Sequence, residues 1–142
     1  MNAKFAVAEI DARKWQSIPT QPESRPLIIL ATNEGGIFSH LLSMLKVEGY
    51  DCEVGALDLS LAERCRAMRP CVVLLDLASG PYIGLSLLGT LKGCREMEGT
   101  EIFAFTGERN EDAEICALEM GADQCTSHPL RTNVVLARIR AA

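Results

Sequence analysis

The sequence has no excess of basic residues, no C-x-x-C pair and no long apolar run. Its 142 residues carry 14 Lys and Arg against 19 Asp and Glu, a formal net charge of −5. Binding to nucleic acid or to an anionic membrane rests on clustered Lys and Arg, so we expect neither from this segment alone. No apolar run approaches the ~20 residues that cross a bilayer. No basic stretch precedes an apolar run at the N-terminus, so we expect no signal peptide.

The six cysteines do not have metal-site or redox-motif spacing. Without a C-x-x-C pair, zinc ribbons and thioredoxin-like sites are disfavoured. The cysteines lie inside apolar, periodic segments, and a chain of this size builds a core without disulfides. We therefore interpret them as buried thiols of a cytoplasmic protein rather than as a disulfide framework.

Two parts of the chain differ in pattern. Residues 1–26 form an N-terminal extension, polar and proline-containing at its end, which holds the single tryptophan, Trp15. It is either a flexible lead-in or a segment in which Phe5, Ile10 and Trp15 dock on this chain or on a partner. Residues 27–142 have a regular pattern and fit one domain.

Short apolar runs recur through the domain and predict buried strands. Three are continuous and two are weaker: 27–30, 72–75 and 102–105, then 52–54 and 124–126. Continuous apolar runs without polar alternation are typical of strands buried on both faces, as in a parallel sheet.

Helical stripes alternate with these strands. They are Ile37/Leu41/Leu45, Leu61/Cys65/Met68, Ile83/Leu87/Leu91, Ile115/Leu118 and Val135/Ile139. Ser60 and Glu63 have capping-box spacing at the start of the second stripe, and Pro70 ends it. The alternation predicts an α/β fold: a five-stranded parallel sheet with five helices and right-handed crossovers.

Polar residues follow the predicted strands at one edge of the sheet. In open parallel sheets, ligands bind at the carboxyl ends of the strands. Those ends carry Thr32, Asn33 and Glu34 after the first strand, Asp76 after the third, Thr106 after the fourth, and Ser127, His128 and Pro129 after the fifth. We therefore expect a carboxylate, a hydroxyl, an imidazole and an amide to converge there.

In this arrangement residues 27–141 resemble the receiver domains of two-component response regulators. The resemblance is carried by Leu74–Leu77, Gly84-Leu85, Phe105-Thr106, Ala117–Asp123 and His128–Leu130. It implies a flavodoxin-like, doubly wound receiver fold with Asp76 at the phosphoacceptor position. It also implies that Thr106 and Cys125 occupy the two switch positions.

The chain departs from the family at the positions that handle charge. Receivers place two acidic residues where Thr32 and Asn33 stand, and Glu34 lies one step further along. His128 replaces the lysine that pairs with the phosphoryl group. Because Mg²⁺ prefers charged oxygen ligands and phosphoryl transfer depends on charge neutralisation, the resemblance implies a degenerate pocket with weak or absent Mg²⁺ binding and no cofactor.

The switch positions also leave alternatives open. Cys125 stands where the family has an aromatic ring, so coupling by ring rotation is excluded. Thr106 is either a switch residue or a helix N-cap or strand-end residue. His128 is either a pH-sensitive contact to Asp76 or a partly exposed side chain. Asn33 is also a candidate cap for the first helix.

The resemblance extends to the dimer face of winged-helix transcription regulators. Asp123 and Arg140 match one of its salt-bridge pairs, and Arg138 is present although Gln124 replaces its acidic partner. Glu114 and Val134 cannot form a third pair. The face is thus partly retained and predicts a homodimer, the alternative being ordinary solvated charge.

Three functions are consistent with these residues. The leading one is a non-enzymatic receiver that acts by protein–protein contact, independently of phosphorylation, on an effector such as a DNA-binding domain. The second is a working phosphoacceptor, with Asp76 phosphorylated by a sensor histidine kinase. The third is a flavodoxin-like small-molecule binder or an Asp-nucleophile hydrolase. It is disfavoured because Gly35-Gly36 lacks phosphate-loop spacing and Ala78 stands where such phosphatases have a second Asp.

Overall fold

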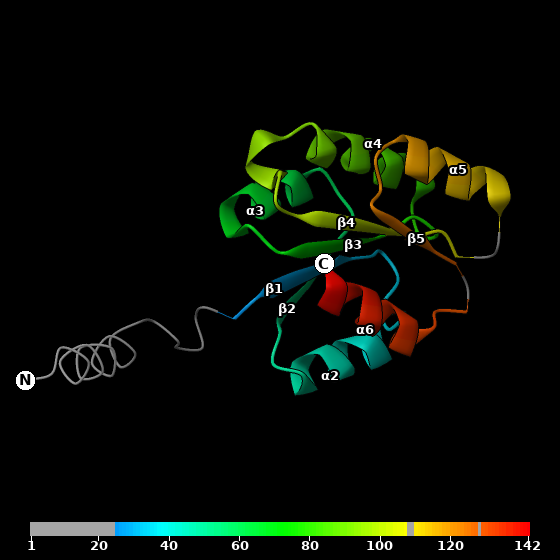
Figure 1. Ribbon diagram of the computed structural model, residues 1–142. Helices are drawn as coiled ribbons and strands as arrows, with labels where there is room; N and C mark the ends of the chain where they lie inside the picture. The colour runs from blue at the N-terminus through cyan, green and yellow to red at the C-terminus, as the bar shows by residue number, and fades with distance from the viewer. Residues whose placement is uncertain (1–24, 108–109, 128) are drawn as a thin grey trace, which may run out of the picture.

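A computed structural model of the chain describes residues 25–107, 110–127 and 129–142 (Figure 1). The proposed docking residues Phe5, Ile10 and Trp15 lie outside the described residues, as does His128. The division into an extension at 1–26 and a domain at 27–142 therefore stays a prediction.

Five parallel strands form one sheet in the order β2-β1-β3-β4-β5. They are β1 (Leu27–Ala31), β2 (Asp51–Gly55), β3 (Val72–Asp76), β4 (Glu101–Phe105) and β5 (Gln124–Thr126). All five lie where the apolar runs predict them. The fold class predicted from the sequence is confirmed.

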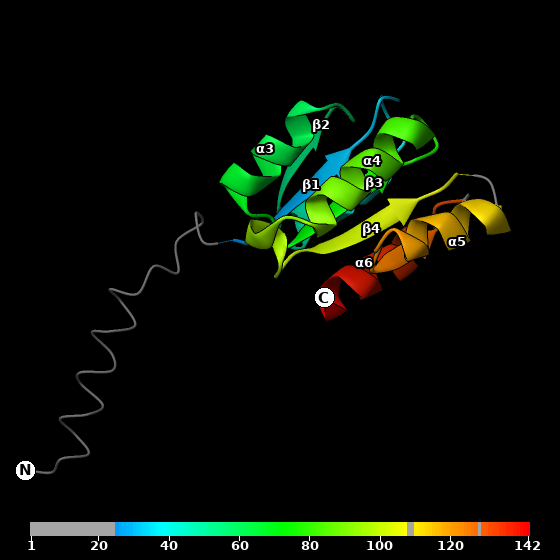
Figure 2. The same cartoon turned by 90° about the horizontal axis from the view of Figure 1, so that it is seen from above.

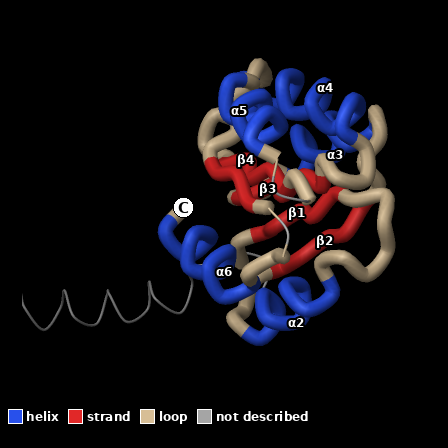
Figure 3. Tube along the Cα trace, turned by 90° about the vertical axis from the view of Figure 1, so that its right-hand side faces the viewer, coloured by secondary structure: helices blue, strands red, loops and turns tan. Residues whose placement is uncertain are grey.

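In the described part of the chain, five α-helices cover the sheet in two layers. They are α2 (Ser39–Val47), α3 (Ser60–Met68), α4 (Pro81–Lys92), α5 (Glu111–Glu119) and α6 (Thr132–Ala141), with a short 3-10 helix at Arg95–Met97. Helices α3, α4 and α5 lie over one face, and α2 and α6 over the other, as Figures 1, 2 and 3 agree. Within the described part of the chain, no helix combines the length and the apolar character needed to cross a membrane.

Alternation along the strands divides the core between the two layers. Ile29, Val73 and Ile102 pack under α3 and α4, whereas their strand neighbours Ile28 and Phe103 pack against α2 and α6. Successive strand residues point to opposite faces, so a strand covered on both sides must be apolar throughout. All five residues of β3 are buried, including Asp76 at its end.

The start of α3 differs from the predicted capping box. Ser60 is the first helical residue, and its backbone N–H and hydroxyl both donate to the Asp58 carboxylate, at 2.9 and 2.6 Å. The capping-box prediction is therefore wrong, because the acceptor lies two residues further upstream. The helix does end before Pro70 as expected, with Arg69 in the left-handed region at a φ of 51°.

The apolar stripe predicted for α5 faces away from the core. Ile115 is 45% exposed and Leu118 49% exposed, and Ala117 is the buried residue of this helix. The helix is present but the prediction that this stripe packs inward is wrong. Its first turn is stabilised instead by the Asn110 side chain, which accepts from the Ala113 N–H at 3.1 Å, and by acidic residues at the positive end of the helix dipole.

Candidate functional site

Asp76 ends the central strand β3 with a fully buried carboxylate. One carboxylate oxygen accepts a hydrogen bond from the Thr32 hydroxyl at 2.6 Å. The other accepts from the Ala78 backbone N–H at 3.1 Å. A buried polar group without partners is costly, and both oxygens of this one are satisfied by neutral donors from within the chain.

Thr32 and Glu34 are tied to each other through one hydroxyl. The Thr32 hydroxyl oxygen accepts from the Glu34 backbone N–H at 2.9 Å while its proton is directed at Asp76. Glu34 is exposed at the surface. In this position the threonine supplies Asp76 with a donor, whereas an acidic residue there would supply a second negative charge.

Asn33 connects the loops after β1, β2 and β3 by hydrogen bonds. Its side-chain oxygen accepts from the Leu57 N–H at 3.0 Å, and its side-chain amide donates to the Leu57 carbonyl at 3.5 Å. Its backbone N–H donates to the Ser79 hydroxyl at 3.0 Å, and that hydroxyl donates to the Asp76 carbonyl at 3.1 Å. The cap of α2 is Phe38, so the interpretation of Asn33 as a helix cap is wrong.

The donor set at this edge does not fit Mg²⁺. The ion prefers charged oxygens in near-octahedral geometry. Thr32 directs its proton at the carboxylate, and both polar atoms of the Asn33 amide are engaged with Leu57. Among the described residues, no three His, Cys, Asp or Glu side chains gather closely enough to hold a metal ion.

Thr106 lies at the end of β4, next to the strand that carries Asp76. Its N–H donates to the Thr126 carbonyl at 2.9 Å, and its hydroxyl lies 3.4 Å from the same oxygen. Asn110 caps α5, so the N-cap interpretation of Thr106 is wrong. Its role as a switch stays a prediction.

The loops after β3 and β4 touch at Gly107. This residue has a φ of +81°, and a Cβ added to it would lie 2.6 Å from the Ala78 Cβ. A glycine is required here both by the backbone conformation and by the close approach. The contact brings Gly107 close to Ala78, whose N–H donates to the Asp76 carboxylate.

Cys125 occupies the middle of β5 and is half-buried. Burial raises the pKa of its thiol, and the nearby Glu114 charge acts in the same direction. The Thr106 hydroxyl and the Arg138 charge oppose these effects. Arg138 also donates to the Cys125 carbonyl at 3.4 Å.

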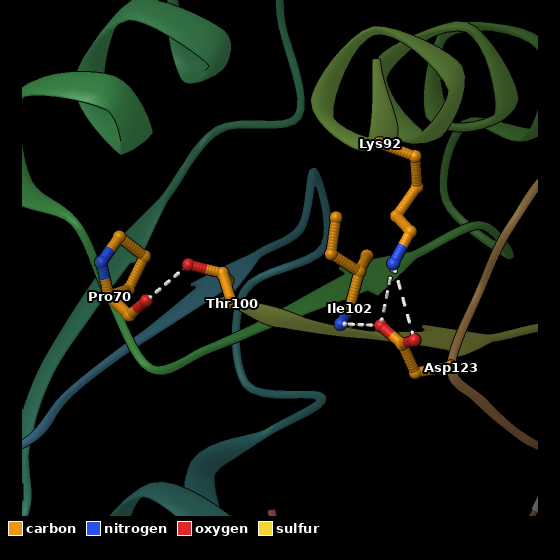
Figure 4. A network of polar contacts seen from close by, with 5 residues as sticks. All are labelled: Pro70, Lys92, Thr100, Ile102 and Asp123. Atoms are coloured by element: carbon orange, nitrogen blue, oxygen red, sulfur yellow. Dashed lines mark hydrogen bonds and ion pairs between the residues drawn. The ribbon is translucent and has the colours of Figure 1, made fainter. Parts of the chain in front are cut away.

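The predicted dimer-face charges have partners within the chain. Asp123 accepts from the Lys92 ammonium at 3.1 and 3.2 Å and from the Ile102 N–H at 2.7 Å (Figure 4). Arg140 donates from Nε to Glu48 at 3.0 Å, and this bond lowers the pKa of the Glu48 carboxyl. Glu48 and Lys92 lie far from their partners in the sequence, so no local spacing predicted these pairs. The dimer itself stays a prediction.

A second polar contact in the same view lies near the start of β4, at the end of the sheet opposite to Asp76. The buried Thr100 hydroxyl donates to the Pro70 carbonyl at 2.6 Å (Figure 4). It joins the turn after α3 to the start of β4. Neither residue was a candidate from the sequence, and neither belongs to the edge that carries Asp76.

The fold of the chain is similar to that of receiver domains in solved structures. It superposes on a CheY-like response regulator receiver domain protein from Methanospirillum hungatei with a TM-score of 0.72, at 22% identity over 83% of this chain and 93% of that one. The BeF3-activated N-terminal receiver domain of Klebsiella pneumoniae RstA gives a TM-score of 0.68, at 23% identity over 81% of this chain and 96% of that one. These matches establish a shared fold.

Sequence comparison points to transcription regulators. The Transcriptional regulatory protein CreB of Escherichia coli is 28% identical over 120 residues, which cover 82% of this chain and 50% of CreB. The chain thus spans about half the length of the curated relatives it matches. No family model matches it.

Proposed function

We propose that this chain, a response-regulator receiver domain related to the winged-helix transcription regulators, signals by protein contact without phosphorylation of Asp76. The observation that carries the proposal is the state of that carboxylate. It is fully buried, and both of its oxygens already accept hydrogen bonds from Thr32 and Ala78. The atom that would attack a phosphodonor is therefore enclosed by its own chain.

Among the described residues, the surroundings of Asp76 also offer little support for phosphoryl transfer. The reaction depends on positioning and on neutralising the charge of the transferred group. Thr32 and Asn33 bring no charge to this edge of the sheet, and the loops around it are fastened by hydrogen bonds at Leu57 and Ser79. A domain built in this way supports a contact function better than a phosphate-transfer function.

The surface proposed for contact is the face formed by α5, β5 and α6. Ile115 and Leu118 present apolar area on α5, surrounded by acidic residues of the same helix. Helix α6 is basic, with Arg138 and Arg140 in its last turn. A two-fold axis that places α5 of one copy against α6 of another would make this face self-complementary, which supports a homodimer.

The length and names of the relatives support a proposal for the partners. Because the matched region covers about half of each of these relatives, which are named transcriptional regulators, we propose a DNA-binding domain as the effector. The proposal also includes a sensor kinase as a partner and a cytoplasmic location.

The test is the intact mass of the protein after incubation with Mg²⁺ and acetyl phosphate. Wild type is compared with Asp76→Asn and with the double variant Thr32→Asp, Asn33→Asp, which restores two carboxylates beside Asp76. We expect no added phosphate on wild type and partial phosphorylation of the double variant, because the added charges create the metal ligands that the edge lacks.

The outcomes separate the two functions. A phosphate on wild type that is absent from Asp76→Asn would overturn the proposal and establish a working phosphoacceptor. Absence of phosphate from wild type would support it. Phosphorylation of the double variant alone would identify the loss of the two carboxylates as the cause.

A further inference from the structure

A cavity opens where α5, β5 and α6 meet, away from Asp76. Its volume is about 420 Å³, and its walls include Glu114, Cys125, Thr126, Ser127, Arg131 and Arg138. Pockets for small ligands typically measure roughly 300–1,000 Å³. The cavity therefore has room for a small organic molecule.

Positive charge predominates among the side chains that line the cavity. The lining contains two arginines, Arg131 and Arg138, and one carboxylate, Glu114. The ion pairs found in the described part of the chain are Arg64–Glu53, Lys92–Asp123 and Arg140–Glu48, and neither lining arginine belongs to them. Two guanidinium groups thus stand at this cavity without a carboxylate within salt-bridge distance among the described residues.

Arg138 has N–H donors that can bind a ligand in addition to its hydrogen bond within the chain. One of its terminal nitrogens donates to the Cys125 carbonyl at 3.4 Å, and a guanidinium carries five N–H donors in a rigid fork. That fork matches the geometry of a carboxylate or a phosphate. The Thr126 and Ser127 hydroxyls at the same wall add donors for further oxygens of the ligand.

The small side chain of Cys125 contributes to the space. This residue lies in the middle of β5 and lines the cavity with a thiol. A phenylalanine at this position would add a ring to the wall. Changing the size of the side chain at position 125 therefore changes the cavity without removing either arginine.

We propose that this cavity binds a small organic anion bearing a carboxylate or phosphate group, held by Arg131 and Arg138. A regulatory role for the bound anion rests on the proposed function, because the anion supplies a signal to a receiver that does not use Asp76. The cavity also lies on the face proposed for self-association. Bound anion neutralises arginines that would otherwise attract the acidic α5 of a second copy, so binding weakens that association.

The cavity is connected to the edge of the sheet that carries Asp76. The Thr126 carbonyl accepts from the Thr106 N–H at 2.9 Å, and the Thr106 hydroxyl lies 3.4 Å away. Thr106 directly follows Phe105, the residue paired with Asp76. A ligand that displaces Thr126 would therefore move the end of β4.

The experiment titrates the full chain with succinate and, separately, with inorganic phosphate, by calorimetry and amide NMR. We expect saturable one-to-one binding of at least one probe, with amide shifts at Cys125, Thr126 and Ser127. Arg138→Gln should weaken binding by about tenfold or more, because it removes a charge-assisted contact. Cys125→Phe should abolish binding by filling the cavity, and Cys125→Ser should retain it.

Arg64→Gln is the control, because Arg64 lies on α3, pairs with Glu53 and does not line the cavity. It should bind the probe as wild type does. Equal weakening in Arg138→Gln and Arg64→Gln, or no saturable binding of either probe, would overturn the inference. Preference for succinate over phosphate, or the reverse, distinguishes the two sources of anion. The mass measurement at Asp76 is independent of both results, so failure of this site and failure of the proposed function are separable.

Discussion

Asp76 is held by hydrogen bonds from a hydroxyl and a backbone N–H. Its position at the end of a buried strand could be predicted from the sequence, because an apolar run leads directly into it. The role of Thr32 as its donor could not, since 44 residues separate the two. The replacement of an acidic residue by threonine predicts a loss of charge, and only the fold shows that the hydroxyl makes a new bond.

Replacing Thr32 by valine tests that bond. The variant keeps the shape of the side chain but removes the one side-chain donor that the described residues give to the Asp76 carboxylate. We expect a loss of about 2 kcal/mol in the free energy of unfolding, measured by urea denaturation, because a buried acceptor loses its partner. Thr32→Ser retains the hydroxyl and should lose clearly less. Equal losses in the two variants would show that packing, and not the hydrogen bond, stabilises this position.

Cys65 predicts a dependence of stability on alkaline pH. Burial raises the pKa of its thiol from 9.0 to about 11. Between these values the unfolded chain has released the proton and the native chain has kept it, so the free energy of unfolding falls as pH rises. The loss attributable to Cys65 is on the order of 2 kcal/mol across this window.

The measurement is urea denaturation at several pH values between 9 and 11. Cys65→Ala should start less stable, because it leaves a cavity, but should decline more shallowly than wild type. Cys116→Ala, at an exposed cysteine, controls for the loss of a thiol. A Cys65→Ala decline as steep as that of wild type would disprove the contribution of this thiol.

At the scale of elements, periodicity predicted where helices occur better than which way they face. The four-residue spacing of Ile37, Leu41 and Leu45 matched the buried side of α2, on which Leu41 and Leu45 are fully buried. The same logic failed for Ile115 and Leu118 of α5, since this helix packs through Ala117. A residue as small as alanine contributes little to the hydrophobic periodicity of a sequence. Its small side chain nevertheless determines how closely a helix can pack on a sheet.

The exposed stripe of α5 predicts an effect on self-association. Ile115→Lys introduces charge into the proposed contact face and should weaken the dimer by about tenfold, as loss of a central apolar contact commonly does. Leu59→Lys is the control, because Leu59 is 77% exposed at the start of α3, a helix that is not part of the proposed face. Sedimentation equilibrium measures both. Equal association in all three proteins would contradict the use of this face.

At the scale of the whole molecule, the parallel five-stranded sheet with five helices could be predicted because it follows from local patterns, whereas its doubly wound arrangement was implied by the resemblance to receiver domains. Five buried runs joined by helices allow few right-handed parallel topologies. Long-range polar contacts could not be predicted in this way. Asn33 reaches Leu57, and Glu48 reaches Arg140 92 residues away. Such pairs depend on where loops and helix ends meet after folding, which no spacing in the sequence records.

The measurement that tests the central claim most directly is an amide NMR titration of the wild-type chain with beryllofluoride and Mg²⁺, a mimic of the phosphorylated aspartate. If Asp76 is enclosed and its edge of the sheet lacks metal ligands, the amide signals of Thr32, Ala78 and Thr106 should stay unchanged at saturating mimic. Saturable shifts of these three signals in wild type, absent in Asp76→Asn, would contradict the account and show that the pocket still accepts a phosphoryl group.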